Sequence, residues 1–249
     1  METFKSGLEL VKPACFFAKL DIKDAYYSLG INKQDRNCLK FTWKDQLYHF
    51  TAMPNGLSPA PRVFTKLLKP VLSSLRKEGY VNCAYIDDIL LIGESYNECL
   101  TNVLETMKLF DSLGFTIHKD KSVVIPKQNI EFLGFLINSM DMTVRLTDKK
   151  TNEIIDLCKW VLNRDIITIR ELAKLVGKFI ASEHGVLYAP LFYKTLEIQK
   201  DEELKKGKGN FDANMTLSSD SKVCIQWWIK NLIHNHKPIV LKSQTRKIE

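Results

Sequence analysis

The sequence lacks the marks of a secreted, disulfide-linked or membrane-spanning protein. Its six cysteines are scattered and form no C-x-x-C pair, so they predict small buried side chains in a reducing compartment, with neither a disulfide framework nor a zinc site. Residues 1–12 contain no continuous apolar core of a signal peptide, and no apolar run is long enough to cross a bilayer. We therefore expect a soluble intracellular protein, cytoplasmic or nuclear, without a membrane partner.

Two further absences concern chemistry. The five histidines show no spacing typical of metal ligands or of a catalytic triad, so we interpret them as incidental. The chain also has no Gly-rich loop that could cradle phosphates, which argues against a nucleotide-hydrolysing switch.

The residues that are present give an ordinary globular composition with an excess of positive charge. Of 249 residues, 45% are hydrophobic and 26% are charged, which argues against disorder and allows one large domain or two smaller ones. Lysine and arginine outnumber the acids by 36 to 29, a net charge of +7. This excess favours a polyanionic partner, because each neutralised phosphate releases condensed counterions. Alone it is a weak signal, since many basic proteins never contact nucleic acid.

The first half of the chain mixes short predicted strands with helices. Apolar patterns predict a buried strand over 15–21 and strands within 38–52, followed by a loop over 53–59. Apolar residues recur at helical spacing over 61–75, where Pro70 should kink the helix.

The most apolar stretch, residues 81–92, predicts two buried strands joined by a two-residue turn. A capping box opens a helix at Ser95, and residues 130–137 predict another strand. After about residue 145 the pattern becomes helical, with a helix over 148–162 and a second capping box at Thr168. Lysine-rich residues 200–214 predict a linker, before a last amphipathic stretch.

Two adjacent aspartates, Asp87 and Asp88, interrupt this apolar hairpin. Burying two like charges a few Å apart costs several kcal/mol unless a positive group lies between them, so the pair indicates a bound hard cation. Oxygen ligands and a partly open coordination sphere suit Mg²⁺ held jointly with substrate phosphates. Asp21, at the end of another predicted strand, could supply an opposing ligand. Two ions in such a site would support in-line phosphoryl transfer. The alternative interpretation is a pair of solvated turn residues.

These residues resemble motifs of reverse transcriptases. The stretch Tyr85-Ile86-Asp87-Asp88 resembles the Y-x-D-D motif, and Leu20-Asp-Ile-Lys-Asp-Ala-Tyr26 resembles the motif that supplies the first catalytic aspartate. Further motifs follow in the family's order: Met53-Pro-Asn-Gly-Leu-Ser-Pro-Ala-Pro-Arg-Val-Phe64, Leu113-Gly-Phe115 with Lys121-Ser122, and Phe132-Leu-Gly-Phe135. Together they cover about residues 15–137. The stretch after Ile169 resembles retrotransposon enzymes, of LTR type or DIRS-like.

The resemblance implies an α+β fold. It comprises a right-hand polymerase palm, in which an antiparallel sheet is backed by two helices (about 61–78 and 96–113), followed by a helical thumb. We expect the palm with a remnant of fingers over 1–142, the thumb over 143–199, and a linker and helical tail over 200–249. The fingers would be largely missing and a ribonuclease H domain absent, so fingers, ribonuclease H, recombinase or integrase parts of a polyprotein are candidate partners.

The resemblance also implies roles for single residues. Asp21 and Asp87 would be the main ligands of two Mg²⁺ ions, which Mn²⁺ could replace, and Asp88 a weaker ligand. Tyr26 would be a steric gate that excludes a 2′-hydroxyl, the less favoured alternative being an ordinary core aromatic. Lys121 would protonate the leaving pyrophosphate, or be an ordinary solvated lysine.

The remaining residues would bind substrate. Asn55, Gly56 and Tyr85 would lie near the incoming deoxynucleoside triphosphate, although Asn55 is shorter than the glutamine or aromatic residue that is more usual there. Phe132, Leu133 and Gly134 would position the primer end, or simply form a core strand.

The implied function is an RNA-directed DNA polymerase that extends a primer on an RNA or DNA template. The alternative is an inactive retroelement fragment that retains the fold and binds nucleic acid. Tyr26 and the Tyr85-Ile86 pair argue against a third possibility, an RNA-directed RNA polymerase.

Overall fold

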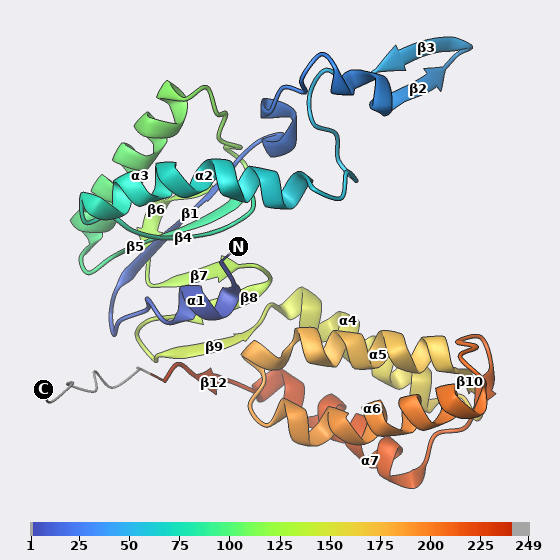
Figure 1. Cartoon of the computed structure of the whole chain (residues 1–249). Helices are drawn as coiled ribbons and strands as arrows, with labels where there is room; N and C mark the ends of the chain where they lie inside the picture. The colour runs from blue at the N-terminus through green and yellow to red at the C-terminus, as the bar shows by residue number, and fades with distance from the viewer. Residues whose placement is uncertain (1, 241–249) are drawn as a thin grey trace, which may run out of the picture. The chain divides into compact units, whose positions relative to one another are not determined.

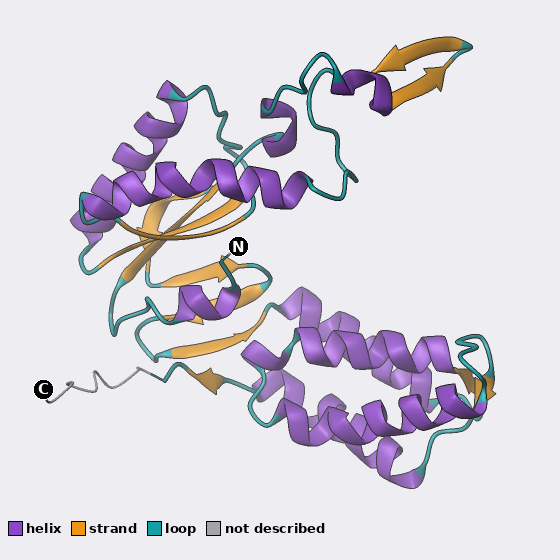
Figure 2. Ribbon diagram, viewed as in Figure 1, coloured by secondary structure: helices purple, strands orange, loops and turns teal. Residues whose placement is uncertain are grey.

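The computed structural model describes residues 2–240, which fall into two compact units, one ending at Leu133 and the other spanning Gly134–Val240 (Figure 1). The first unit mixes helices and strands, whereas the second is largely helical (Figure 2). The division lies before the palm–thumb boundary predicted at residue 142. Within residues 2–240 no helix is long and apolar enough to cross a membrane.

The first unit is built on a four-stranded antiparallel sheet in the order β4-β5-β1-β6. Its strands are β1 (Phe16–Asp21), β4 (Val81–Tyr85), β5 (Asp88–Gly93) and β6 (Val123–Lys127). A short strand, β7 (Asn129–Phe132), follows. Buried residues follow one another along β1 and β5 instead of alternating with exposed ones, as in strands whose two faces are both covered.

Helices α2 (Ala60–Lys77) and α3 (Tyr96–Ser112) cover one face of this sheet (Figure 1). They place Phe64, Leu68 and Val103 into a core with Leu20 and Ile89 of the strands. Both helices arise where the sequence predicted them, and α2 continues past Pro70 to Lys77. The predicted capping box opens α3, since Ser95 Oγ accepts a hydrogen bond from the Glu98 amide.

The opposite face is covered by α1 (Phe4–Leu8), a helix that the sequence did not predict. A methyl group on Gly7 of α1 would lie 3.4 Å from Cys83 Sγ of β4, so a small residue allows this close approach. Phe4 stacks on Phe132 at 6.4 Å between ring centroids. The central strands β1 and β5 are therefore buried on both faces, whereas the edge strand β6 is largely exposed.

A two-stranded ribbon, β2 (Lys40–Trp43) and β3 (Gln46–His49), extends from the rest of the first unit (Figure 1). All eight of its strand residues are exposed, including Trp43 at 62%. The 3₁₀ turns Ala25–Ser28 and Asp35–Leu39 precede it.

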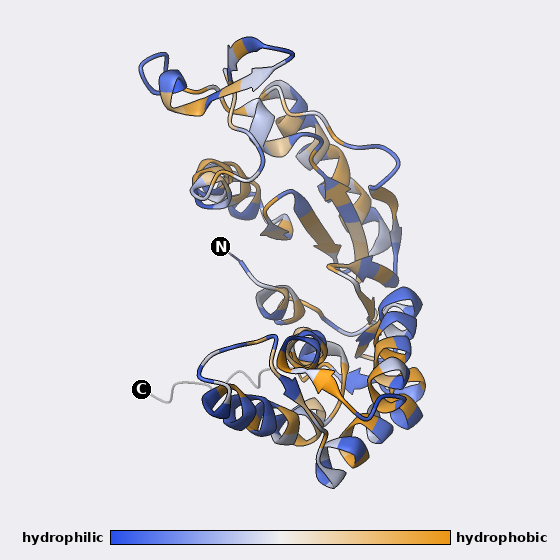
Figure 3. Cartoon of the chain, turned by 90° about the vertical axis from the view of Figure 1, so that its right-hand side faces the viewer, coloured by the Kyte–Doolittle hydropathy of each residue, from blue (hydrophilic) through white to orange (hydrophobic). Residues whose placement is uncertain are grey.

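The second unit is a bundle of helices with a small sheet. Its helices are α4 (Asp148–Leu162), α5 (Ile169–Ala181), α6 (Ala189–Lys206) and α7 (Ser219–Asn231), and its short 3₁₀ turns are Glu183–Gly185 and Leu232–His234. Its strands are β8 (Phe135–Asn138), β9 (Thr143–Leu146), β10 (Ile167–Thr168), β11 (Asn214–Met215) and β12 (Lys237–Pro238). These helices carry both hydrophobic and hydrophilic residues, as helices with one buried and one exposed side do (Figure 3). Trp228 of α7 is fully buried and stacks on Phe179 of α5 at 4.0 Å.

Two predictions of local structure are wrong. The linker predicted over 200–214 is helical in its first half, because α6 continues to Lys206 and ends at Gly207. The single strand predicted over 130–137 is interrupted by Leu133 and Gly134, which have φ angles of 51° and 76°. Left-handed backbone at two successive residues cannot continue a strand, so the chain turns there. The last residues of the predicted tail, 241–249, lie outside the described part of the chain.

Candidate active site

The two adjacent aspartates lie at a tight turn between β4 and β5, as the sequence predicted. Tyr85 and Asp88 are direct cross-strand partners, and only Ile86 and Asp87 form the turn between them. Ile86 has a φ angle of 57°, which is unfavourable for a β-branched residue. A strained conformation of this kind persists only where the surrounding structure enforces it.

Asp21 is brought to this turn by backbone hydrogen bonds. The amide of Ile22 donates to the Asp87 carbonyl at 2.9 Å, and the amide of His118 donates to the Asp21 carbonyl at 2.8 Å. Ser122 also links Asp21 to the segment around His118. Its Oγ accepts from the Asp21 amide at 3.0 Å and donates to the His118 carbonyl at 2.8 Å. Asp21 is only 9% exposed, and these hydrogen bonds fix its backbone at the end of β1.

A cavity of about 400 Å³ lies at this junction, with a mostly polar wall. It brings together five of the predicted site residues, which are Asp21, Tyr26, Asn55, Asp87 and Lys121. These residues come from the end of β1, the following 3₁₀ turn, the loop before α2, the β4–β5 turn and the segment before β6. The remaining lining residues are Ile22, Lys23, Asp24, Ala25, Tyr27, Ile86 and His118.

Asp88 does not line this cavity, although the sequence grouped it with Asp21 and Asp87. It is the cross-strand partner of Asp21, and its carboxylate lies 3.8 Å from Lys19 Nζ. Burial raises the pKa of Asp88, and Lys19 opposes this shift while the charges of Asp87 and Asp21 add to it. Asp88 therefore interacts electrostatically with both aspartates from beside the cavity.

Tyr26 lines the cavity and also packs in the core. Its ring meets that of Phe64 edge-on, at 5.8 Å between centroids. Burial raises the pKa of the Tyr26 hydroxyl, and the charge of Asp87 contributes to the same shift. The two interpretations of Tyr26, core aromatic and gate, are thus compatible in this fold.

The other predicted substrate residues lie elsewhere. Gly56 and Tyr85 are not among the residues that line the cavity, although Tyr85 is close enough to Tyr26 to affect its pKa. Phe132 is fully buried, and Leu133 and Gly134 form the turn described above. Their role in positioning a primer stays a prediction.

The acidic side chains suit a hard cation only in part. Among residues 2–240, no three His, Cys, Asp or Glu side chains converge as a ready-made metal site. The cavity instead contains Asp21 and Asp87, with Asp24 at its wall. Mg²⁺ typically binds through one or two carboxylates, with waters and substrate phosphates completing its coordination. The donor chemistry of Asp21 and Asp87 therefore fits Mg²⁺ that binds together with a triphosphate.

Sequence reasoning missed three residues. His118 was interpreted as incidental, yet it lines the cavity and fixes the Asp21 carbonyl. Ser122 holds β1 in place, and Lys19 lies beside Asp88. The position of Lys19, two residues before Asp21 on the same strand, was a usable signal, because residues i and i+2 share a face. Ser122 stands in the Lys121-Ser122 motif, which gave it no role of its own, and nothing in the spacing indicated His118.

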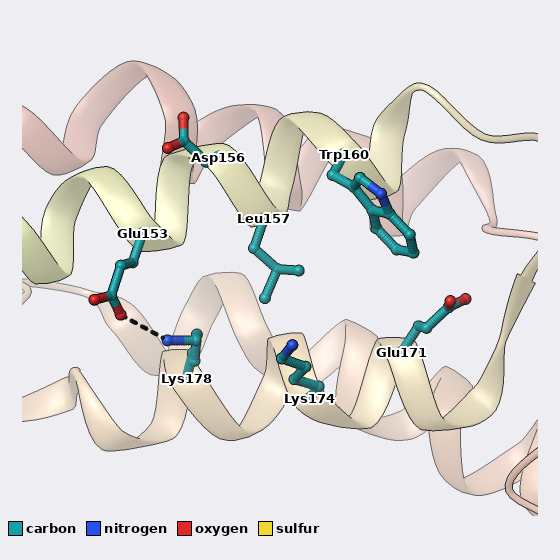
Figure 4. A pocket seen from close by; sticks show the side chains of 7 residues that line it. All are labelled: Glu153, Asp156, Leu157, Trp160, Glu171, Lys174 and Lys178. Atoms are coloured by element: carbon teal, nitrogen blue, oxygen red, sulfur yellow. Dashed lines mark hydrogen bonds and ion pairs between the residues drawn. The ribbon is translucent and has the colours of Figure 1, made fainter.

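A second cavity, of about 610 Å³, lies between α4 and α5 in the helical unit (Figure 4). It is lined by Glu153, Asp156, Leu157, Trp160, Glu171, Lys174 and Lys178. Lys178 Nζ is paired with Glu153 at 3.0 Å, and Asp156 points away from the space between the two helices (Figure 4). None of the residues that the motifs predicted for the site lies in this cavity, whereas five line the cavity near Asp21, which is therefore the candidate active site.

A comparison of the sequence with family models decides its identity. The model described as reverse transcriptase (RNA-dependent DNA polymerase) matches residues 2–137, more than half of the chain. The chain belongs to the reverse transcriptase family. Relatives of this reverse transcriptase region include the Transposon Tf2-3 and Tf2-7 polyproteins of Schizosaccharomyces pombe (strain 972 / ATCC 24843), 29% and 28% identical over 136 residues. The match covers 55% of this chain but only 10% of each polyprotein.

Solved structures support the same fold. The foamy viral protease-reverse transcriptase in complex with dsDNA has a TM-score of 0.74 at 20% identity, over 98% of this chain and 47% of that chain. The same viral enzyme in complex with RNA/DNA hybrid has a TM-score of 0.73, also at 20% identity, over 94% of this chain and 29% of that chain. The α+β fold class and the retroelement family predicted from the motifs are confirmed. The LTR-type or DIRS-like subclass stays a prediction.

Proposed function

We propose that this chain is the polymerase core of an RNA-directed DNA polymerase, which transfers deoxynucleotides onto a primer 3′-hydroxyl. The observation that supports this most strongly is the position of Asp21 and Asp87. Asp21 ends β1 and Asp87 lies in the β4–β5 turn, and both line one polar cavity with Tyr26, Asn55 and Lys121. Nucleotide transfer requires acidic metal ligands, a binding position for the sugar and a cationic group, all within one cavity.

Asp21 and Asp87 would hold two divalent ions, Mg²⁺ or Mn²⁺. Bound ions would stabilise both the attacking and the leaving oxygens of an in-line displacement. Asp88 would act from beside the cavity, where its charge strengthens the negative potential at Asp21 and Asp87. Lys19, 3.8 Å from Asp88, would limit the repulsion among the three carboxylates when no cation is bound.

The rest of the cavity would bind the deoxynucleoside triphosphate. The Tyr26 ring is held by Phe64 and would leave no room for a 2′-hydroxyl. The Asn55 amide would contact the nucleotide at shorter reach than a glutamine would. Lys121 Nζ would donate a proton to the pyrophosphate oxygen that leaves.

The partner would be a primer paired with an RNA or DNA template. The net charge of +7 and the complexes of the foamy viral enzyme with dsDNA and RNA/DNA hybrid support this proposal. Since this chain matches a tenth of the length of the Tf2 polyproteins, other polyprotein domains would act with it.

Primer extension tests the proposal. The purified chain is given a DNA primer on an RNA template, with deoxynucleotides and either Mg²⁺, Mn²⁺ or EDTA. Metal-dependent extension supports a polymerase. A folded chain that binds the primer–template but extends nothing, even with added fingers segment, would support the alternative of an inactive nucleic-acid-binding fragment.

A further inference from the structure

The strand that leads into the acidic turn has one open side. In the order β4-β5-β1-β6, β4 is an edge strand. Tyr85 and Asp88 pair directly across the two-residue turn, so the backbone groups of Tyr85 point toward β5. The alternation of an antiparallel ladder then directs the N–H and C=O groups of Asn82 and Ala84 away from β5. An edge of this kind needs other partners.

Two side chains from outside the sheet occupy this edge. Glu2 Oε2 accepts a hydrogen bond from the Ala84 amide at 2.6 Å, and Arg76 donates to the Asn82 carbonyl at 3.2 Å. Glu2 Oε1 and Arg76 are themselves joined at 2.6 Å. The Glu2–Arg76 pair therefore takes the place of a neighbouring strand, satisfying one donor and one acceptor of the edge.

Further side-chain hydrogen bonds hold β4 and the base of the hairpin. Arg76 Nε donates to Asn82 Oδ1 at 2.9 Å, so one guanidinium contacts both the backbone and the side chain of Asn82. Asn102 of α3 donates to the carbonyls of Val81 and Ile92, at 2.8 and 3.1 Å. The hairpin is thus fixed at its base by Asn102 and along its edge by Glu2 and Arg76.

The turn itself has room to move if this anchor is lost. A cavity of about 280 Å³ beside α2 is lined by Ala84 and Ile86 together with Glu2 and Arg76. Ile86 has the strained φ of 57°, so relaxation of the turn would be favourable once the strand is released. Any such movement would carry Asp87 with it.

We propose that Glu2 and Arg76 are positioning residues, which hold β4 so that the strained turn keeps Asp87 in the candidate active site. This inference rests on the proposed function, since it takes Asp87 to act in nucleotide transfer. Neither residue touches the substrate cavity. Their effect would pass through Ala84 to the turn two residues later.

The test compares Arg76→Ala, Arg76→Lys and Glu2→Gln with a control on the same helix, Lys77→Ala, which is exposed and outside the network. Amide hydrogen exchange at Ala84 and through residues 81–93 is measured in the folded full chain, together with kcat and KM for deoxynucleotide incorporation. Arg76→Lys retains the charge but loses the planar fork that contacts Glu2 and Asn82 at once. Glu2→Gln retains an oxygen for the Ala84 amide but loses the ion pair.

We expect amide exchange at Ala84 to be about tenfold faster in Arg76→Ala than in the wild type, because an ionic hydrogen bond is lost. In Arg76→Lys the exchange rate should lie between these two. We expect kcat to fall about tenfold or more with little change in KM, since a misplacement of about 1 Å can cost roughly 10²-fold. Glu2→Gln should lie between Arg76→Ala and the wild type.

Unchanged exchange in Arg76→Ala would overturn the anchoring. Faster exchange with unchanged kcat would overturn the positioning role and leave a purely structural contact. If the wild-type chain incorporates no nucleotide, the proposed function fails by itself. The exchange of residues 86–88 then still decides whether Glu2 and Arg76 hold the turn.

Discussion

Asp21 of β1 and Asp88 of β5 are direct cross-strand partners at the end of their ladder. Directly opposite residues share a face, so two negative charges are held side by side, with Asp87 at the adjoining turn. Like charges in this position are destabilising. Burial is the main reason that the pKa of Asp88 is raised; the charges of Asp87 and Asp21 add to this shift, and Lys19, 3.8 Å from Asp88, opposes it. The fold keeps an unfavourable arrangement that a bound cation would relieve.

Replacing Asp88 by asparagine should stabilise the protein in EDTA. The substitution removes the charge opposite Asp21 and should increase the free energy of unfolding by about 0.2–1 kcal/mol. Urea denaturation of the wild type and Asp88→Asn would measure this. Asp111→Asn, on the exposed side of α3, is the matched control and should leave stability within experimental error. A loss of stability in Asp88→Asn would contradict the account.

The increase in the free energy of unfolding that Asp88→Asn brings should depend on pH in a defined direction. Because burial raises the pKa of Asp88 in the folded state, the folded protein binds this proton more tightly than the unfolded chain. The stability of the wild type relative to Asp88→Asn should therefore fall as pH rises from 3.8 through the raised pKa. Well below pH 3.8 the Asp88 carboxyl is protonated in both the folded and the unfolded protein, so its pH-dependent contribution to the free energy of unfolding no longer changes. If the stability advantage of Asp88→Asn over the wild type grew as the pH falls, the result would contradict this prediction.

Replacing the Tyr26 ring by a smaller side chain should weaken the selectivity for deoxynucleotides over ribonucleotides. In Tyr26→Val the side chain no longer fills the space beneath the sugar. The preference for deoxynucleotides over ribonucleotides, measured as the ratio of kcat/KM values, should fall about 10- to 200-fold. Tyr26→Phe retains the ring and its contact with Phe64, so it should retain the preference. Equal selectivity in Tyr26→Val and the wild type would refute the gate.

Removing the Ser122 hydroxyl should loosen β1 at its functional end. The Oγ both accepts from the Asp21 amide and donates to the His118 carbonyl, so Ser122→Ala removes both bonds and takes this partner from the Asp21 amide, while the His118 carbonyl still accepts from the Ser122 amide. We expect the free energy of unfolding to fall by about 1–3 kcal/mol. Ser112→Ala, whose hydroxyl is exposed at the end of α3, serves as control. Equal effects of the two substitutions in thermal unfolding would argue against the bridge.

Much of the fold was predictable because local rules decided it. The capping boxes at Ser95 and Thr168 open α3 and α5 where expected, and the apolar hairpin around Asp87 forms as expected. Local rules failed where backbone geometry or packing decides. The left-handed residues Leu133 and Gly134 break an apolar run that otherwise predicts one strand.

The site was predictable from motif resemblance but not in its full geometry. Asp21, Asp87 and Lys121 meet in one cavity as the resemblance implied, whereas Asp88 lies beside it with Lys19. A sequence states that two aspartates are adjacent, but not that Asp87 lies in the turn while Asp88 begins β5. His118 could not be found, because its contribution includes a backbone hydrogen bond that any residue type could make.

The cysteines provide a test of the fold that is independent of activity. Cys38 is exposed, whereas burial raises the pKa of the Cys83, Cys99 and Cys158 thiols to about 12. In the native protein at pH 8, iodoacetamide should modify Cys38 first and leave these three unmodified. Mass spectrometry of tryptic peptides identifies the sites, and urea-unfolded protein gives the reference. Rapid modification of Cys99 in the native state would contradict the packing of α3 on the sheet.

The central claim is that Asp21 and Asp87 together perform metal-dependent nucleotide transfer. The most direct measurement is the rate of single-nucleotide incorporation on a primed RNA template, with Mg²⁺ or Mn²⁺, for the wild type, Asp21→Asn, Asp87→Asn and the control Asp111→Asn. We predict incorporation by the wild type and by Asp111→Asn, and a loss of about 10³-fold or more in either site variant, since each removes transition-state stabilisation that a carboxylate-bound ion supplies. Incorporation at the wild-type rate by a folded Asp87→Asn protein would contradict the account.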